Sequence, residues 1–344
     1  MLAIRASGMV TSVGFNSAAS CAAMRAGIRC VNQTTFWDIP TEAYLTAGKV
    51  GLPHWWVGLG KLADLVAPAI LECLRAAEPI PAERIPVLLG VAGPNRPFRL
   101  AGLDTELLGE IEERLGFRLH PASGVMPQDH TFVVPALRVA ANLIVGGQAT
   151  CIIVAAVDSL IRQDLAKYYL SKKRLLTKKN SNGFAMGEAG SAVLVTSGDA
   201  RPGGQLRILG MGMGREKAAI ESEEPLRAEG LTQAIREAFR DGGVTYDDVQ
   251  YRITDLNDEH YKFKEMILAM LRFQRKPKPK LFDLWHPIEY IGDVGAAIGP
   301  IILGLALHAG HKGYGVGPGV LCTLGNDEGE RSALVARYEG GEVR

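Results

Sequence analysis

The chain has no strong excess of charge of either sign. Among its 344 residues, 38 lysines and arginines are balanced by 37 aspartates and glutamates, so the formal net charge is +1. A dedicated nucleic-acid-binding protein usually shows a strong basic excess. A disordered chain has fewer apolar residues than the 47% found here. The composition therefore predicts a soluble globular protein with a sizeable core and no nucleic-acid partner.

Cysteine is scarce and shows no metal-binding or disulfide pattern. The five cysteines are odd in number and contain no CxxC pair; they are Cys21, Cys30, Cys73, Cys151 and Cys322. This excludes a standard zinc module and argues against a disulfide framework. We therefore expect a reduced, cytoplasmic setting, with no metal and no cofactor.

Long apolar runs and a targeting segment are also absent. The first ten residues lack the basic region and the apolar stretch of a signal peptide. The longest run without Asp, Glu, Lys or Arg, residues 294–310, contains Pro300, several glycines and His308. It is marginal in length for crossing a bilayer and is better explained as a buried helix. No membrane span is expected.

What the sequence does contain is an alternation of apolar runs of strand length with helical patterns, and about 12% glycine (40 of 344). The runs 85–93 and 149–159 are continuously apolar, which is typical of strands buried on both faces. Buried strands that alternate with helices predict an α/β fold with mostly parallel sheets. Strands are expected over 2–14, 85–93, 149–159, 190–197, 205–214, 249–256, 279–285, 319–326 and 333–339, and helices over 16–27, 58–78, 105–116, 132–147, 227–243, 258–273 and 294–310.

The alternation occurs twice, which predicts two similar halves. The first spans residues 1–197, with excursions from the core near 30–60 and 160–182, and the second spans 204–344. Each half contains one almost wholly apolar helix, so these two helices are expected in a central layer that is covered on both sides.

Five segments of the chain carry a family resemblance, and they follow one another along the chain in the order found in that family. NGFAMGEAGSAVLV (182–195) resembles the glycine-rich GFxxGEGAG segment of the β-ketoacyl synthases, the condensing enzymes of the thiolase superfamily, and GDVGAAIGPIILGLAL (292–307) resembles their GHxxGAAG segment. The remaining three are ASGMVTSVGFNSAASCAAMRAG (6–27), AANLIVGGQATCIIVAAVDS (140–159) and VLCTLGNDEGERSALV (320–335). The resemblance implies a five-layered αβαβα thiolase-like fold built from two pseudo-repeated halves, and usually a homodimer.

The same resemblance implies that the condensing chemistry is lost. Such enzymes use a cysteine at the start of the buried helix, where the helix dipole lowers its pKa, and two histidines that assist decarboxylation and stabilise an oxyanion. A register without gaps places His130 at the cysteine and Asp255 at the first histidine. The second histidine falls on Gly292, or on Asp293 if one residue is deleted, and the family's lysine falls on Pro287, beside His286.

Two interpretations of these residues remain open. His130, Asp255, His286 and Asp293 can form a new polar constellation at the old site, or they can be relics that fill a closed or wetted cavity. A metal site made of His286, His130 and Asp255 is a further alternative, although these residues lack the usual ligand spacing. We regard no catalytic residue as assigned.

The favoured hypothesis is a non-catalytic, homodimeric binding protein that acts as an adaptor. In this respect the chain resembles thiolase-like accessory proteins found beside bacterial type VI secretion effectors, which implies an effector or another adaptor as partner. The first alternative is a divergent acyltransferase or condensing enzyme that acts on an acyl-thioester through His130. The second is a non-catalytic partner of an active ketosynthase, with that ketosynthase or an acyl carrier protein as its partner.

Other segments give weaker indications of function than the family motifs do. The basic runs 171–180 and 275–280 predict either solvated loops or docking to an acidic partner. The segments FWDIP (36–40) and HWWVG (54–58) place three tryptophans in a poorly patterned region, as partner anchors or as packing onto the core. GMGMG (210–214) lacks the spacing of a nucleotide-binding loop.

Overall fold

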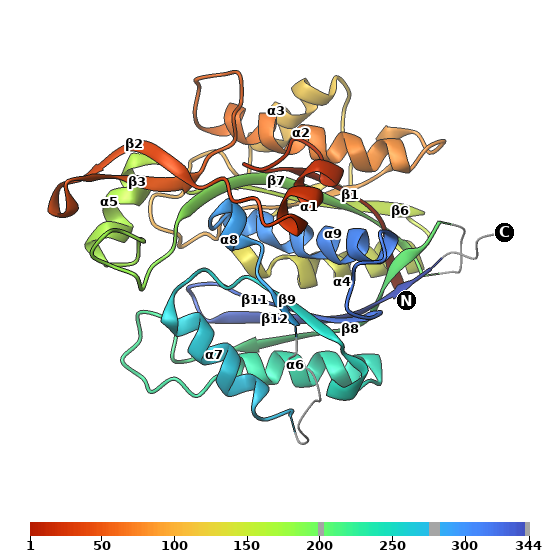
Figure 1. Ribbon diagram of the computed structural model, residues 1–344. Coiled ribbons are helices and arrows are strands. Elements are labelled where there is room, and N and C mark those ends of the chain that lie inside the picture. Colours follow the sequence, from red (N-terminus) through yellow and green to blue (C-terminus); the bar gives the residue numbers. More distant parts are fainter. Residues whose placement is uncertain (199–202, 275–282, 341–344) are drawn as a thin grey trace.

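The chain folds into five layers, seen edge-on in Figure 1. The computed structural model describes residues 1–198, 203–274 and 283–340. The outer helices α2 (Leu59–Ala76) and α3 (Leu107–Leu115) cover one sheet layer, and α6 (Glu229–Gly242) and α7 (His260–Met270) cover the other. Between the two sheet layers lie α1 (Ser17–Arg25), α4 (Val133–Val145), α8 (Ile288–Ile291) and α9 (Ile298–His311). The αβαβα architecture expected from the sequence is therefore confirmed.

Each half of the chain contributes five strands in the same spatial order. The N-terminal strands lie in the order β5-β4-β6-β7-β1 and the C-terminal strands in the order β10-β9-β11-β12-β8. Numbered within each half, both orders read 3-2-4-5-1. The N-terminal strands are β1 (Leu2–Val10), β4 (Val87–Gly90), β5 (Gly124–Met126), β6 (Cys151–Ser159) and β7 (Met186–Ser197). Their C-terminal counterparts are β8 (Gln205–Arg215), β9 (Tyr251–Thr254), β10 (Asp283–Trp285), β11 (Gly319–Gly325) and β12 (Glu330–Glu339).

The expectation of mostly parallel sheets is wrong. In each half the three outer strands are parallel, whereas the long central strands pair antiparallel: β6 with β7, β7 with β1, β11 with β12, and β12 with β8. The central strands are buried on both faces because helices cover both sides of each sheet layer. Their apolar runs therefore look like those of parallel strands, and burial conceals the strand direction. The two halves join through a short antiparallel pairing of β1 residues 2–4 with β8 residues 206–208.

The central helix layer is covered unevenly. The helix α9 is buried along nearly its whole length, as its apolar sequence predicts. The helix α4 buries its first two turns, including Val134 and Leu137, but Val139 and Val145 are 38% and 84% exposed. The expectation that both helices are covered on both sides holds for α9 and only for the first part of α4.

Glycines bring the outer helices directly onto the strands. A Cβ at Gly190 of β7 would lie 2.1 Å from the carbonyl oxygen of Leu65 in α2. The GMGMG segment repeats this arrangement on β8, where alternate glycines face α6 and a Cβ at Gly212 would lie 2.0 Å from the carbonyl oxygen of Ala234. Side chains alternate between the faces of a strand, so a glycine at every second position clears one face for a helix. The segment is therefore a packing motif.

The two expected excursions contain regular structure. Residues 30–60 include a hairpin of β2 (Asn32–Asp38) and β3 (Ala43–Gly48), and residues 160–182 include α5 (Gln163–Ser171). The tryptophans of this region lie at the surface, with Trp37 50%, Trp55 91% and Trp56 38% exposed. Single 3-10 turns complete the described structure; they are η1 (Ile39–Thr41), η2 (Ala82–Arg84), η3 (Asp129–Thr131), η4 (Tyr246–Asp248) and η5 (Gly295–Ala297).

Two segments singled out in the sequence lie wholly or partly outside the described residues. The basic run 275–280 and the first part of the expected strand 279–285 lie outside the described residues. The division of the chain into units at 197 and 204 stays a prediction. Within the part that the structure describes, no helix has both the length and the hydropathy needed to cross a bilayer.

Candidate functional site

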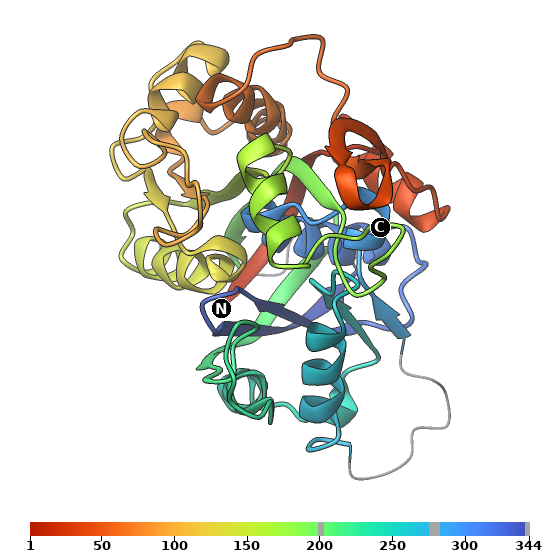
Figure 2. The same ribbon diagram turned by 90° about the vertical axis from the view of Figure 1, so that its left-hand side faces the viewer.

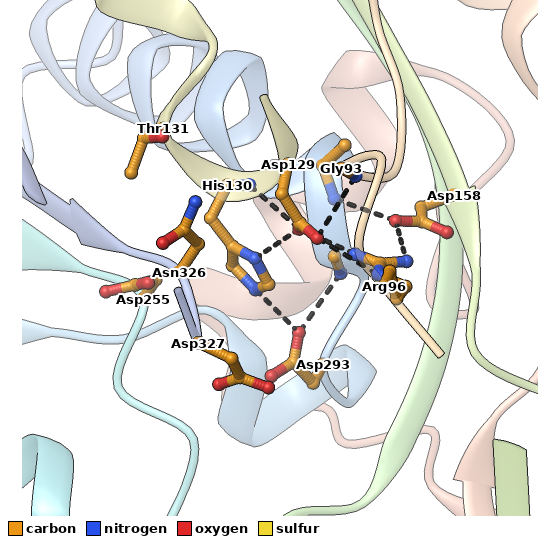
Figure 3. Close-up of polar contacts among 12 residues, drawn as sticks. Gly93, Arg96, Asp129, His130, Thr131, Asp158, Asp255, Asp293, Asn326 and Asp327 are labelled. Carbon is orange, nitrogen blue, oxygen red and sulfur yellow. Dashed lines mark hydrogen bonds and ion pairs between the residues drawn. The ribbon is translucent and has the colours of Figure 1, made fainter. Parts of the chain in front are cut away.

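His130 lies at the start of the innermost helix of the N-terminal half. It is the middle residue of η3, which leads directly into α4. Both of its ring nitrogens face carboxylates: Nδ1 lies 2.6 Å from Oδ1 of Asp129, and Nε2 lies 3.1 Å from Oδ1 of Asp293 (Figure 3). All three residues are buried. His130 and Asp293, two of the four candidates from the sequence, are therefore in direct contact.

The two carboxylates keep His130 protonated. Burial alone would favour the neutral imidazole, but the negative charges of Asp293 and Asp129 outweigh it and raise the pKa of His130 to about 10. Burial would also favour the neutral form of Asp293, yet contact with His130 holds the pKa of that carboxyl well below its usual range. At neutral pH the group at the helix start is therefore an imidazolium, which has no nitrogen lone pair to attack a thioester.

The backbone amide at the same position is also occupied. The N–H of His130 donates to Oδ1 of Asp129 at 2.9 Å. Free amides at a helix start can stabilise the negative oxygen that develops during acyl transfer. Here a carboxylate already holds the amide, and its charge would repel such an oxygen.

Ion pairs extend from His130 further into the N-terminal half. Arg96 contacts Oδ1 of Asp129 through Nη2 at 2.6 Å and Oδ2 of Asp158 through Nη1 at 2.5 Å. Asp158 is the second-last residue of β6, and it also accepts the backbone N–H of Ala296 at 3.0 Å. The ionic contacts thus run from the end of a central strand to the start of α4.

A second set of polar contacts leads from Asp293 through the C-terminal half. Oδ2 of Asp293 accepts Nδ2 of Asn257 at 2.8 Å, and the same amide group lies 3.2 Å from Oε2 of Glu259. Glu259 in turn pairs with both Nε and Nη2 of Arg174 at 2.8 Å. Arg174 belongs to the basic run 171–180 and is buried, so the interpretation of that run as a solvated loop is wrong at this residue.

The remaining two candidates from the sequence do not contact His130. Asp255, just after β9, accepts Nζ of Lys262 at 3.1 Å and the backbone N–H of Gly325 at 2.9 Å. His286 follows β10 and packs edge-on against Phe263, with 6.0 Å between the ring centroids. It lines a different cavity from His130, so the structure does not bring all four candidates together, nor His286 to His130 and Asp255 as the metal alternative requires.

The structure also distinguishes the two registers proposed for the second histidine. Gly292 has a φ of 76°, and a Cβ there would lie 2.5 Å from the carbonyl oxygen of Met186. Asp293 is the residue whose side chain reaches His130. The register with one residue deleted is therefore the one that places a functional group in the site.

A charged cavity of about 200 Å³ opens beside His130. Lys262 lies on the boundary between this cavity and a smaller one that contains Asp255. Burial favours the neutral amine, but the charge of Asp255 and of other nearby carboxylates outweighs it and raises the pKa of Lys262. The cavity is lined by Asn95, Arg96, Pro97, Asp129, His130, Leu160, Tyr168, Tyr169, Arg174, Phe184, Glu221, Lys262, Asp293, Asn326, Asp327 and Glu328.

Sequence reasoning missed most of the residues that surround His130. Arg96 and Arg174 lie in segments without a family motif, and Asp129 is next to a residue that was itself singled out only by register. Asp158 does have a recognisable pattern in the sequence, because a carboxylate at the end of an apolar strand indicates a buried charge. Such a residue needs a buried partner, but the sequence does not indicate which one.

The cysteines of the described chain lie away from this site. Among the described residues, none of the five cysteines lines the cavity beside His130. Cys21, Cys73, Cys151 and Cys322 are buried, and burial raises the pKa of Cys21 and of Cys322 to about 12. A thiol of this kind stays protonated and unreactive at neutral pH.

Comparisons with known proteins identify the fold. No protein-family model matches the chain, and no curated protein matches it. Solved structures do match over nearly all of it. One is a ketosynthase in complex with its chain length factor from Xenorhabdus doucetiae, with a TM-score of 0.77, 14% identity and coverage of 98% of both chains.

Two further solved structures match the chain with similar TM-scores and similarly low identity. The ishigamide ketosynthase/chain length factor gives a TM-score of 0.70 at 17% identity, covering 98% of this chain and 99% of that one. A ketosynthase from module 6 of the bacillaene synthase of Bacillus subtilis gives 0.74 at 13% identity, covering all of this chain and 73% of that one. The chain therefore has the fold of these ketosynthases.

Proposed function

We propose that this chain is a non-catalytic ketosynthase-fold subunit that acts by binding a partner of the same fold, in the manner of a chain length factor. Two of the matched structures contain a ketosynthase together with a chain length factor. Their fold covers this chain almost end to end. The proposal therefore favours the ketosynthase partner over the secretion adaptor as the role of this protein.

The observation that carries the proposal is the doubly paired imidazolium of His130. Acyl capture needs an unprotonated nucleophile and free donors for the oxyanion. His130 has both ring nitrogens and its backbone amide committed to carboxylates. A group in this state stabilises the junction of the two halves and does not take up an acyl chain.

A second observation supports a partner of the same fold. The strand β5 ends the sheet on one side, and an edge strand offers unpaired backbone groups to another chain. The side chain of Met126 in β5 packs against the same core cluster as Leu143 and Ile144 of α4. The exposed Val139 and Val145 are on that helix, and Figure 2 shows the yellow segments of β5 and α4 on one side of the molecule. A free edge strand and exposed valines on one side of a molecule are typical of a protein–protein contact.

The absence of acyl capture can be tested directly. The purified chain is incubated with acetyl- and malonyl-thioesters of coenzyme A, with an active ketosynthase as positive control, and its intact mass is measured. We expect no covalent adduct. A stoichiometric adduct that disappears in His130→Ala would support the acyltransferase alternative and overturn the proposal.

The partner role is tested by co-expression with the ketosynthase encoded nearest to the gene. We expect a one-to-one complex by size exclusion with light scattering. Val145→Glu should abolish it, because a charge would be buried in the contact. Ile267→Glu on α7, at a site that is 52% exposed, is the matched control and should leave the complex intact. A ketosynthase that never co-elutes, or equal effects of the two variants, would contradict the proposal.

The remaining predictions concern other partners. The homodimer, the acyl carrier protein and the role in handling type VI secretion effectors rest on the sequence resemblance alone. The light-scattering mass of the chain by itself tests the homodimer in the same experiment.

A further inference from the structure

A cavity that we call the β10–α1 cavity lies apart from the His130 site. Its walls come from α1, β10, α8, α9 and the loop after α9. Its volume is about 230 Å³, whereas an apolar cavity of about 150 Å³ is already large enough to hold benzene. The β10–α1 cavity can therefore accept one ring that carries a short side chain.

The walls of this cavity are apolar and aromatic. Met24 and Leu305 are its most buried wall residues. The rings of Trp285 and Tyr314 are stacked at 30°, with 6.0 Å between their centroids, and Tyr290 adds a third ring. Aromatic side chains pack well against another planar ring, either offset face to face or edge to face. The walls therefore fit a ligand whose body is a planar ring.

The guanidinium of Arg25 has hydrogen-bond donors to spare at this cavity. Arg25 is the last residue of α1, and its guanidinium carbon lies over the ring of Tyr314, 4.5 Å from the centroid. Among the residues that the structure describes, no carboxylate or other acceptor bonds to this guanidinium. Stacking on a ring engages only the flat face of the guanidinium, so the N–H groups along its edge remain available. That edge matches the geometry of a carboxylate.

The charges next to Arg25 on α9 are also positive. His308 is half-buried in the last turn of α9. Its pKa is lowered by burial and by the positive charges of Lys312, His311 and Arg25. Several cations thus lie close together at this side of the cavity, which favours the approach of an anion.

The anion in the wall does not offset this preference. Among the described wall residues the one carboxylate is that of Glu289. Burial and a hydrogen bond to Glu289 raise the pKa of Tyr290 to about 12. Glu289 is therefore already engaged by a neighbouring hydroxyl, whereas Arg25 has no acceptor within the described chain.

We propose that the β10–α1 cavity binds a small aromatic carboxylic acid, whose ring packs against Trp285 and Tyr290 and whose carboxylate accepts hydrogen bonds from Arg25. The site goes beyond the proposed partner role and does not depend on it, because none of its residues lines the cavity beside His130. It lies at the β10 edge of the sheet, at the opposite end of the strand order from β5.

The site is located by ¹⁹F NMR of the full chain labelled with 5-fluorotryptophan and titrated with phenylacetate. The chain has four tryptophans, of which Trp285 lines this cavity and the other three belong to residues 37–56. Trp285→Phe assigns the Trp285 resonance by its loss. We expect that resonance to shift saturably with phenylacetate while the other three stay in place.

Variants test the role of the guanidinium in the same titration. Arg25→Gln removes the charge and should weaken phenylacetate binding about tenfold or more, the value of one charge-assisted hydrogen bond. Arg118→Gln is the matched control, because Arg118 lies in the loop after α3 with its side chain 89% exposed, and it should bind as the wild type does.

A neutral probe separates the charge from the shape of the cavity. 2-Phenylethanol has the same ring and chain length as phenylacetate but no charge. It should bind the wild type more weakly than phenylacetate does, and Arg25→Gln should leave its affinity unchanged. A Trp285 resonance that does not move at millimolar phenylacetate, equal affinities of the Arg25 and Arg118 variants, or equal binding of the two probes by the wild type would overturn the proposal.

Discussion

Replacing Asp293 by asparagine tests the charge network at its centre. Asp293→Asn keeps the size of the side chain but removes the negative charge 3.1 Å from Nε2 of His130. The imidazolium then retains only Asp129, which it shares with Arg96. Removing one partner of a buried ion pair costs about 3 kcal/mol or more. At about 2.1 cal/mol/K per residue, 344 residues give an unfolding entropy of about 0.7 kcal/mol/K, so Tm should fall by about 4 °C.

The pH dependence of this loss follows from the two pKa shifts. The folded pKa of His130 is raised to about 10, so its pairing contributes fully below the unfolded value of about 6.5 and is lost as pH rises through 10. The folded pKa of Asp293 is lowered, so its contribution is present above about 4 and lost in acid. The loss of unfolding free energy in the variant, relative to wild type, should therefore be largest near pH 6 and small or reversed above pH 10.

Differential scanning calorimetry of wild type and Asp293→Asn at pH 6, 8 and 10.5 measures this deficit. Asp104→Asn is the matched control, because Asp104 pairs with Arg99 at the surface, where its side chain is 51% exposed. An exposed pair contributes about 1 kcal/mol or less. A variant as stable as wild type at pH 6, or a deficit unchanged at pH 10.5, would refute the reasoning.

Other consequences of the structure can be measured separately. Iodoacetamide should label the native chain only at Cys30, the half-buried cysteine, and should label all five cysteines after denaturation. Mass spectrometry counts the adducts. Fast labelling of any other cysteine in the native chain would contradict its burial. Gly190→Ala should destabilise the fold by about 2 kcal/mol or more, because its Cβ would meet the carbonyl oxygen of Leu65 at 2.1 Å. Gly109→Ala in α3, where no atom lies within 4 Å of the added Cβ, should instead stabilise by about 0.5–1 kcal/mol, and denaturant unfolding distinguishes the two. Lys61→Met should cost about 3 kcal/mol in the same assay because it removes the cation beside the fully buried Glu188, which then keeps only hydrogen bonds from the N–H of Val50 and the hydroxyl of Ser159; a neutral result would refute the importance of that ion pair.

The sequence predicts the fold because the core repeats a simple pattern. Apolar strands such as β6 and the apolar helix α9 can be recognised from composition and length alone. Strand direction cannot be predicted in this way, because burial on both faces conceals it. The sequence also does not predict how the two halves join, because the strands that pair there, β1 and β8, are far apart in the chain.

The site is less predictable because its contacts join distant segments. Register against the family identified His130 and Asp293, which are 163 positions apart and in contact. Nothing in the sequence indicates that Arg96 bridges Asp129 and Asp158, or that Arg174 turns inward from a basic run to Glu259. Each charge requires a buried partner, but many pairings satisfy that requirement, and only the three-dimensional structure selects one.

The most direct test of the account is the protonation state of His130 itself. Selective ¹⁵N labelling of histidine, with the resonance assigned by its loss in His130→Gln, reports both ring nitrogens by NMR. We expect a doubly protonated ring at pH 7.5 and a titration midpoint near pH 10. A neutral ring at pH 7.5 would leave a lone pair free for chemistry, and it would contradict the claim that this position has lost its nucleophile.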